Sequence, residues 1–458
     1  MKSYQFNGIL TESGWLENAV ISVDSNGIIT SIGPQKNTET EVVNGLALPG
    51  FQNAHSHAFQ YAMAGLAELH DGAGNPDDFW SWRTAMYELA LQFSPEQLED
   101  IATMLYAEML RNGYTSVAEF HYVHHDKNGK EYANLAELGE RLVAAAKRAG
   151  IRITLVPMFY QMGGFGKPAE DKQRRFISKT VDDYYRLLER SKEVAKNYRK
   201  ATVAMGIHSL RAVKGEDIIR VSEEFQNDIP FHIHIAEQLK EIKDCEQFYG
   251  KRPVEWMLEK VDLNELFHLV HATHLNDAEV RGIAEVKANV VLCPTTEGNL
   301  GDGLFRFHDF NKLGGSWSIG TDSHVSINPL EELRLLDYGQ RVTTHQRTTF
   351  YQHGRGESGF NALKQAWQAG RKATASSSEQ FFQIGAPFDA VVIDANAPLI
   401  ASSSPKNWCN TIVYSSDVSH VLGTLVQGKW VVKYGQYPSK TDIYQRFTKT
   451  MLELKSRL

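Results

Sequence analysis

Cysteine is scarce in this chain of 458 residues, which contains three cysteines and no Cys-x-x-Cys pair. Cys245, Cys293 and Cys409 therefore predict no disulfide framework, and the reducing cytoplasm is the expected compartment. The chain also lacks a hydrophobic run long enough to span a bilayer, and its first residues, MKSYQFNGIL, contain no apolar signal-peptide core. We expect a soluble cytoplasmic protein without a membrane partner.

An excess of one charge is also missing. The net charge is −7, from 48 lysines and arginines against 55 acidic residues, and the two signs are interspersed along the chain. This balance argues against a nucleic-acid partner, because surfaces that bind nucleic acids concentrate basic residues. No long low-complexity segment is present. Length alone suggests about three domains, although large barrels fold as single units.

Both ends of the chain have the pattern of β-structure. Residues 18–33, NAVISVDSNGIITSIG, form two strand-like runs around Asn26-Gly27, a dipeptide typical of hairpin turns. The stretches FDAVVIDAN and TLVQGKWVVKYG, near the other end of the chain, also read as strands. We expect one small β-sandwich domain built from residues 1–49 and 384–438.

The last segment of the chain, residues 439–458, predicts a helix. Its apolar residues Ile443, Phe447, Met451 and Leu454 recur at helical spacing. A stripe of this kind is typical of a helix that packs on the outside of a larger domain.

The middle of the chain, residues 50–383, alternates short apolar runs with amphipathic stretches such as EQLEDIATMLYAEMLRN, which stops at Gly113. Eight candidate strands can be counted: LPGFQNAH from Leu48, TSVAEFHYV from Thr115, IRITLVPMF from Ile151, TVAMGIHSL from Thr202, PFHIHIAE from Pro230, FHLVHATHL from Phe267, NVVLCPTTEG from Asn289, and SWSIGTDSH from Ser316. Strand-helix alternation repeated eight times predicts an α/β fold, a (β/α)8 TIM-type barrel. Residues 66–95, rich in Trp, Asp and Gly, predict a loop over its mouth.

Polar side chains stand at the ends of several predicted strands, where the active sites of such barrels lie. His55 and His57 close the first strand, and both can face the mouth because side chains two residues apart point the same way. Further candidates follow the fifth, sixth and eighth strands: His234 and Glu237, His271, and Asp322. Three histidines and one aspartate suit Zn²⁺ with room for a water, and Fe²⁺ or Mn²⁺ would accept the same ligands.

Spacing leaves some alternatives open. It does not separate two pairs of neighbours, His232 from His234 and His271 from His274. Glu237 falls just past the strand end, where it is either a proton shuttle or an acid at a helix N-terminus.

At these residues the sequence resembles the amidohydrolase superfamily, and within it the metal-dependent deaminases. The motifs LPGFQNAHSH, HIHIAE, LVHATH and GTDSH occur in the family's order and cover the whole barrel. The fourth strand ends with His208, where two-metal members have a lysine that carries a bridging carbamate, so one zinc per chain is expected. The resemblance implies the metal ligands His55, His57, His234 and Asp322. It implies three catalytic residues: Glu237 as proton carrier, His271, and Asp322.

Longer stretches narrow the resemblance to enzymes that release ammonia from N-formimino-L-glutamate in histidine degradation, leaving N-formyl-L-glutamate. They are HSHAFQYAMAGLAE, FWSWRTAMY, EFHYVHHD, GIHSLRAV and GTDSHVSINPLEELRLLDYGQR. Tyr61 departs from the pattern, since an arginine is expected there. The resemblance also implies a homodimer.

The expected substrate is small and acidic, with two carboxylates, and arginine binds carboxylates through two parallel hydrogen bonds. Arg83 stands in the loop after the first strand, and Arg211 stands just after the fourth. The resemblance assigns both arginines to the substrate carboxylates and adds Gln60, Tyr122 and His208 to the pocket.

Two other functions stay open at this point. A related deaminase of guanine, another purine or a nucleoside would stack its base on aromatic rings, and Trp80 and Trp82 lie in the predicted loop over the mouth. The second is a non-catalytic scaffold barrel. A scaffold has no reason to keep all six polar residues at the strand ends, which are His55, His57, His234, Glu237, His271 and Asp322.

Overall fold

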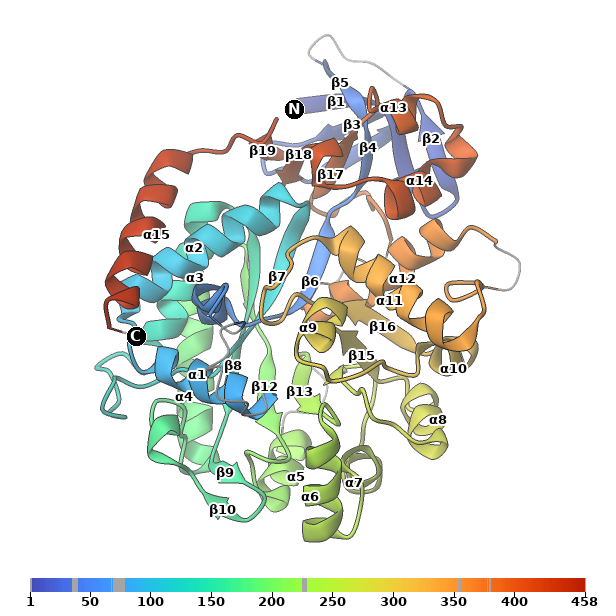
Figure 1. Ribbon diagram of the computed structural model, residues 1–458. Coiled ribbons are helices and arrows are strands. Elements are labelled where there is room, and N and C mark those ends of the chain that lie inside the picture. The colour runs from blue at the N-terminus through green and yellow to red at the C-terminus, as the bar shows by residue number, and fades with distance from the viewer. Residues whose placement is uncertain are drawn as a thin grey trace.

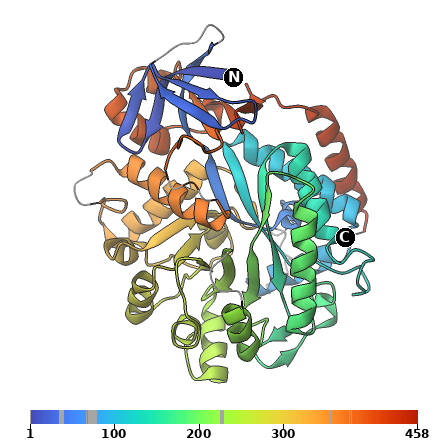
Figure 2. The ribbon, with the colours of Figure 1, turned by 180° about the vertical axis from the view of Figure 1, so that it is seen from behind.

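The computed structural model has a barrel with a second, smaller sheet beside it (Figure 1). The described residues are 2–34, 40–66, 68, 79–224, 229–352, 356–376, 378 and 380–457. Figure 2 gives the opposite view, in which the first strands and the C-terminal segment again share the smaller sheet. Within the described ranges, we find no helix with the length and apolar character that crossing a membrane requires.

A parallel sheet forms the barrel that the sequence predicted. Its strands follow chain order: β6 (Phe51–Ser56), β7 (Tyr114–His121), β8 (Arg152–Phe159), β12 (Met205–Ser209), β13 (Phe231–Ile235), β14 (Phe267–His271), β15 (Asn289–Leu292) and β16 (Ser316–Ile319). A short strand, β11 (Ala201–Val203), pairs with β8. The two end strands meet where the N–H groups of Thr321 and Asp322 both donate to the carbonyl oxygen of His55, at 3.0 Å. The predicted (β/α)8 fold is confirmed.

Helices cover the outside of the barrel (Figure 1). They are α2 (Pro95–Arg111), α3 (Glu137–Ala149), α4 (Val181–Ala195), α5 (Gly215–Glu224), α6 (Leu239–Tyr249), α7 (Pro253–Lys260), α8 (Asp277–Glu285), α10 (Phe307–Lys312), α11 (Pro329–Thr344) and α12 (Ser358–Ala373). α2 illustrates how the sequence sets their limits. Ser94, directly before Pro95, forms a capping box with Gln97 of the first turn, and Gly113, with a φ of 94°, follows the C-cap residue Asn112.

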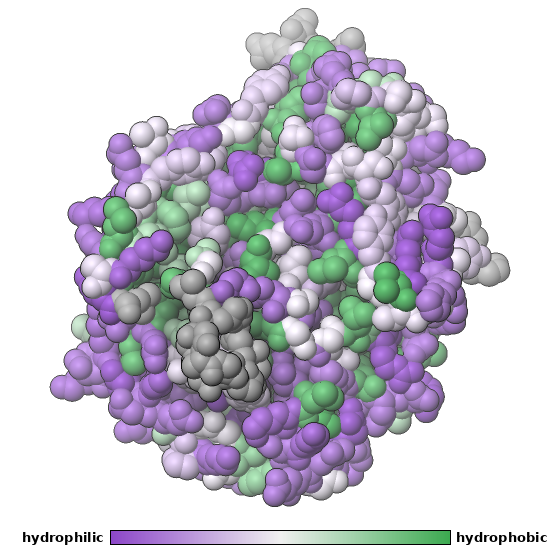
Figure 3. Space-filling view, in the orientation of Figure 1, coloured by the Kyte–Doolittle hydropathy of each residue, from purple (hydrophilic) through white to green (hydrophobic). Residues whose placement is uncertain are grey.

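Shorter elements lie in the connections between strands and helices. They are η1 (Ala58–Met63), α1 (Phe79–Ala90), β9 (Met162–Gly164), β10 (Lys167–Pro168), η2 (Asp171–Gln173) and α9 (Pro294–Asn299). Figure 3 shows hydrophilic residues over most of one face of the molecule, with apolar residues in small scattered groups. Scattered apolar residues are normal on a protein surface.

The second sheet combines strands from both chain ends, as predicted. Its strands are β1 (Lys2–Thr11), β2 (Gly14–Glu17), β3 (Val20–Val23), β4 (Ile29–Gly33), β5 (Thr40–Pro49), β17 (Ala390–Asp394), β18 (Val421–Val426) and β19 (Lys429–Lys433). The order is β19-β18-β17-β5-β1-β3-β4, with β2 beside β1. The antiparallel pair of β5 and β17 joins the two ends. The predicted hairpin turn is present at Gly27 (φ 74°), and Gly428 (φ 66°) turns the chain between β18 and β19.

Helical segments occupy the rest of the C-terminal region. Between β17 and β18 lie α13 (Pro398–Ala401), η3 (Pro405–Asn407), α14 (Trp408–Ser415) and η4 (Val418–His420). The last helix, α15 (Lys440–Lys455), packs on α2, where Ile443 is buried with Met104 and Ala107. The domain boundaries, 1–49 with 384–438, 50–383 and 439–458, stay a prediction.

Two of the predicted strands have different limits. The run from Leu48 is divided between the two sheets, because β5 ends at Pro49 and β6 begins at Phe51. The run from Asn289 ends as a strand at Leu292, and α9 follows it. Pro294 occupies the first helical position, where a backbone N–H is not needed.

The structure describes only part of the predicted loop over the mouth, residues 66–95. Residues 67 and 69–78 lie outside the described residues, so the lid prediction is not tested there. Residues 79–90 form α1 rather than a loop, with Phe79 and Met86 among its buried residues.

Candidate metal site and active site

Four side chains converge at the carboxyl ends of the barrel strands. His55 lies on β6, His57 directly follows it, His234 lies on β13, and Asp322 follows β16. The Nε2 atom of His55 is 3.1 Å from that of His57 and 3.0 Å from that of His234. Oδ1 of Asp322 lies 3.3 Å from Nε2 of His55 and 3.2 Å from Nε2 of His57. The predicted metal ligands therefore form one compact cluster.

The spacing and charge of this cluster fit a small divalent cation. Bonds to Zn²⁺ of about 2.0–2.2 Å place tetrahedral ligand atoms roughly 3.3–3.6 Å apart. Burial lowers the pKa of His55 to about 3 and the pKa of His234 well below its usual value, so both rings are neutral. Nδ1 of His57 donates to the carbonyl oxygen of Phe120 at 2.8 Å, so the lone pair of the neutral ring lies on Nε2, which faces the cluster. One cation would satisfy these lone pairs together with the carboxylate of Asp322.

The backbone around the cluster has uncommon dihedral angles. His271, Asp322 and His324 all have positive φ, at 70°, 45° and 65°. Such conformations cost on the order of 1–3 kcal/mol for residues other than glycine, and they cluster at functional sites. Here the residues with positive φ lie at or shortly after the ends of β14 and β16, at the mouth of the barrel.

His271, at the end of β14, is surrounded by carboxylates. Its Nδ1 lies 3.2 Å from Oε1 of Glu297, and its Nε2 lies 3.7 Å from Oε1 of Glu237 and 3.9 Å from Oδ2 of Asp322. Burial alone lowers the pKa of His271, but Glu237 and Glu297 are the main groups that raise it to about 10. The ring is therefore protonated at neutral pH and presents an N–H towards the reacting groups.

Glu237 forms a buried ion pair with Arg211. Its Oε2 accepts a hydrogen bond from Nη2 of Arg211 at 3.0 Å, while its Oε1 faces His271. Glu241, in the first turn of α6, accepts from the N–H groups of Ala236 and Glu237 at 3.3 and 3.1 Å. Glu241 is thus the acid at the helix N-terminus, and Glu237 faces the cluster.

A buried carboxylate behind the histidines anchors their turn. Glu119 on β7 accepts hydrogen bonds from Oγ of Ser56 at 2.7 Å, from the N–H of Ala58 at 2.6 Å and from the hydroxyl of Tyr106 at 3.0 Å. Burial raises the pKa of Glu119 to about 7. These three bonds fix the chain on both sides of His57 and so hold the orientation of its imidazole.

Two arginines face the same space beside the cluster. Arg211 follows β12, and Arg83 lies on α1. Burial is the main reason that the pKa of His208 lies well below its usual value, and both guanidiniums lower it further. Both also act on the hydroxyl of Tyr160, whose pKa burial raises. Arg83 covers the ring of Trp80 at 4.5 Å, so this ring is already engaged by a cation.

Polar atoms without partners mark the remainder of the pocket. Within the described part of the chain, nothing forms a hydrogen bond with Nε of Arg211 or Oε1 of Gln60. Nε2 of Gln60 donates to the hydroxyl of Tyr122 at 2.9 Å. The ring of Tyr122 packs 5.0 Å from that of His57 and 5.3 Å from that of His208. Nε of Arg211 lies 3.8 Å from Oε2 of Glu241, within ion-pair range. Because buried polar atoms are nearly always bonded, the unpartnered Oε1 of Gln60 is the atom that indicates a ligand.

The structure separates the histidine pairs that spacing leaves open. His232 stacks on His268 at 4.8 Å, and its Nε2 is bonded to the carbonyl oxygen of Ala373 at 3.1 Å. His232 is therefore engaged outside the cluster. His274 is partly exposed, whereas the ring of His271 stacks on that of His234 at 5.5 Å.

Sequence reasoning missed the carboxylates that support the predicted residues, namely Glu119, Glu241 and Glu297. Glu297 had a local signal, because the run Cys-Pro-Thr-Thr-Glu is typical of a helix start, with proline first and an acid in the first turn. Glu119 had none, since its partner Ser56 lies 63 positions away in the sequence.

Sequence similarity to known proteins covers both the barrel and most of the second sheet. The sequence model of the Amidohydrolase family matches residues 46–431. Formimidoylglutamate deiminase of Pseudomonas aeruginosa is 42% identical over 451 residues, which cover 97% of this chain and 98% of that protein.

Solved structures are similar over the same extent. One described as an amidohydrolase from Brucella melitensis has a TM-score of 0.93 at 38% identity, and covers 99% of this chain and 100% of its own. An adenosine deaminase from Xanthomonas campestris, solved with bound zinc, has a TM-score of 0.82 at 20% identity, with 99% and 98% covered. The second likeness shows the fold alone.

Proposed function

We propose, because this chain belongs to the amidohydrolase family, that it is a metal-dependent deiminase of N-formimino-L-glutamate. It hydrolyses the formimino group to give N-formyl-L-glutamate and ammonia, a step of histidine degradation. The observation that carries the proposal is the similarity to a formimidoylglutamate deiminase over nearly the whole chain. The two arginines beside the cluster, Arg83 and Arg211, match a substrate with two carboxylates.

The proposed ligands of one Zn²⁺ per chain are His55, His57, His234 and Asp322. Fe²⁺ and Mn²⁺ suit the same donor set, and neutral histidines with one carboxylate favour zinc among common cellular metals. The chemistry that Zn²⁺ supplies when bound is a more acidic water and a polarised bond at the carbon under attack.

The residues of the chain handle the protons. Asp322 takes a proton from the attacking water on Oδ2, the oxygen nearer to His271. Glu237, a carboxylate in its ion pair with Arg211, takes the second proton of this water on Oε1 and delivers it to the nitrogen that leaves. The proton held by Asp322 passes to the same nitrogen. His271 donates a hydrogen bond from Nε2 to the negative charge that develops on the oxygen bonded to the attacked carbon. The C–N bond breaks, ammonia departs, and the formyl oxygen derives from water. General acid–base assistance of this kind contributes about 10²–10⁴-fold in rate.

Substrate recognition rests on the two arginines. Each guanidinium binds one carboxylate, and Arg211 does so while it is ion-paired with Glu237 and Glu241. Gln60, Tyr122 and His208 complete the pocket. An adenine or guanine ring has no carboxylate to offer, and the ring of Trp80 is covered by Arg83.

The compartment and assembly are proposed from composition and family. The three cysteines, all buried and free, fit the reducing cytoplasm. We propose a homodimer that acts on a small acidic substrate, with no nucleic-acid or membrane partner. Light scattering after size exclusion tests the dimer, and a monomer at assay concentration contradicts it.

A substrate panel tests the proposed function. Purified metal-loaded enzyme is given N-formimino-L-glutamate, guanine or adenosine, and ammonia and N-formyl-L-glutamate are both quantified. We expect equal amounts of the two products from the first substrate and none from the purines. If only a purine releases ammonia, the proposal is rejected in favour of a purine deaminase. If none of the three substrates releases ammonia, it is rejected in favour of a non-catalytic scaffold.

A further inference from the structure

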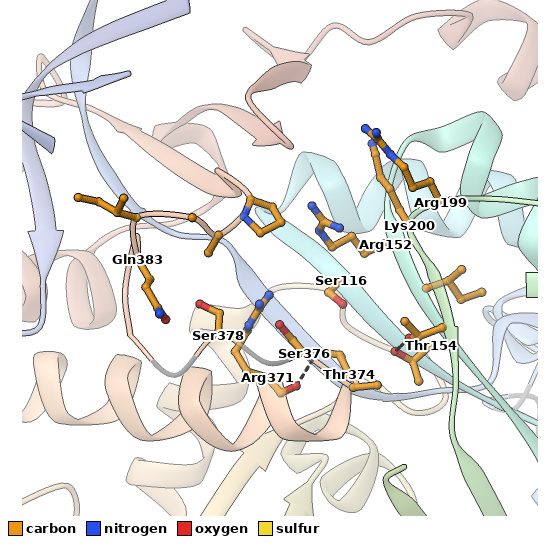
Figure 4. A pocket seen from close by; sticks show the side chains of 17 residues that line it. Ser116, Arg152, Thr154, Arg199, Lys200, Arg371, Thr374, Ser376, Ser378 and Gln383 are labelled. Carbon is orange, nitrogen blue, oxygen red and sulfur yellow. Dashed lines mark hydrogen bonds between the residues drawn. The ribbon is translucent and has the colours of Figure 1, made fainter. Parts of the chain in front are cut away.

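A cavity of about 370 Å³ lies at the amino ends of the barrel strands, opposite the metal-ligand cluster. Ser116 lines it near the start of β7, and Arg152 lines it at the start of β8. Arg371 and Thr374 enter from the C-terminal end of α12, and residues 383–387 close another side (Figure 4). The cavity is therefore separate from the proposed active site.

Cationic side chains dominate the lining of this cavity. They are Arg152, Arg199, Lys200 and Arg371. Neither aspartate nor glutamate occurs among the lining residues that the structure describes. Figure 4 shows Arg371 rising from α12, with Gln383 on one side of the space and Arg152, Arg199 and Lys200 on the other. The lining thus concentrates positive charge from three separate elements.

Arg371 is the least compensated of these cations. It is 8% exposed, and its Nε has no hydrogen-bond partner in the described ranges of the chain. Asp389 attracts it electrostatically but is hydrogen-bonded to Arg152, at 2.5 and 3.2 Å, and to the N–H of Gln427, at 2.6 Å. Burial lowers the pKa of Arg371 to about 10, which still leaves it charged at neutral pH. Arg371 therefore shares the charge of Asp389 with Arg152, and a bound anion would supply the further compensation that this buried cation lacks.

We propose that this cavity binds a phosphate-type oxyanion, either inorganic phosphate or a phosphate monoester. Guanidiniums bind phosphate oxygens through paired, charge-assisted hydrogen bonds. The hydroxyl of Ser376 supplies a further donor in the same lining. Donors that approach from several directions suit a tetrahedral anion better than a planar carboxylate. The volume lies within the range of small-molecule sites, about 300–1,000 Å³, and leaves room for an ester substituent.

Calorimetric titration of the metal-loaded full chain with inorganic phosphate tests this site. Ionic strength is held constant with sodium chloride, so that general screening does not contribute. We expect one phosphate per chain, and we expect Arg371→Met to weaken binding about 10- to 100-fold. Arg211→Met is the matched control, because it removes a buried arginine from the other basic site and should leave the phosphate affinity unchanged.

Three further measurements decide the remaining outcomes. Glycerol 3-phosphate binding more tightly than phosphate identifies an ester as the ligand, and the reverse identifies free phosphate. Glutarate is titrated into the Arg211→Met chain, in which the proposed dicarboxylate pocket lacks one arginine, and tighter binding than both phosphates there contradicts a phosphate-type ligand. If circular dichroism shows that Arg371→Met does not fold, the partly exposed Lys200→Met replaces it, and an unchanged affinity there overturns the proposal. No phosphate binding, or loss in Arg211→Met with retention in Arg371→Met, overturns it as well.

Discussion

Replacing Arg211 by methionine tests substrate recognition most sharply. The substitution removes the guanidinium but keeps an unbranched side chain in a buried position. If Arg211 binds a substrate carboxylate, a charge-assisted hydrogen bond worth about 1.5–3 kcal/mol is lost. The value of kcat/KM for N-formimino-L-glutamate should then fall about 10- to 150-fold.

The same substitution also leaves Glu237 without its partner at 3.0 Å, which would slow the reaction of every substrate. Two analogues separate the effects. N-formimino-4-aminobutyrate lacks the α-carboxylate, and N-formimino-2-aminobutyrate lacks the side-chain carboxylate. One of these analogues lacks the carboxylate that Arg211 binds. With that analogue, Arg211→Met should lower kcat/KM only by the factor that the unpartnered Glu237 causes. The difference between substrates is the interaction energy of a double-mutant cycle.

Ammonia release measures all the rates in this cycle. Arg83→Met is the matched variant, and it should be sensitive to the other carboxylate. An equal loss for Arg211→Met on the glutamate derivative and on both analogues would refute carboxylate binding by Arg211. Its role would then be limited to holding Glu237.

The residues around the cluster can be tested one at a time. Glu237→Gln should retain its metal by elemental analysis and lose about 10²–10⁴-fold in kcat; full activity would remove Glu237 from proton transfer. Glu297→Gln removes a carboxylate that helps raise the pKa of His271 to about 10. His271 then loses its proton at lower pH, so the alkaline limb of the kcat/KM profile should move to lower pH, and an unmoved limb contradicts this role. Glu119→Gln weakens the anchor of His57, and competition with a chelator should show metal affinity reduced about 10- to 100-fold. An affinity equal to that of the unchanged enzyme would show that this anchor does not orient the ligands.

Strand ends and their polar residues could be predicted from the sequence because the signals are local. His55 and His57 are two positions apart at the end of one strand, and the eightfold alternation of strands and helices fixes which ends share the barrel mouth. The hairpin turn at Gly27 was predictable for the same reason, since Asn-Gly tolerates the positive φ that the turn requires.

The contacts between side chains of different strands could not be predicted, because the partners are distant in the sequence. Arg211 and Glu237 are 26 positions apart, and Ser56 and Glu119 are 63 apart. Periodicity within a segment carries no information on such pairs, which depend on how neighbouring strands are registered. α9 is different, because its starting proline was a readable signal that the apolar run before it obscured.

Anomalous X-ray scattering from crystals of the metal-loaded enzyme tests the central claim most directly. Data collected on either side of the zinc absorption edge locate the cation and identify it. We predict one peak per chain, within about 2.0–2.2 Å of Nε2 of the three histidines His55, His57 and His234 and of an oxygen of Asp322. A peak held by other residues, or no peak in active enzyme, would contradict the account.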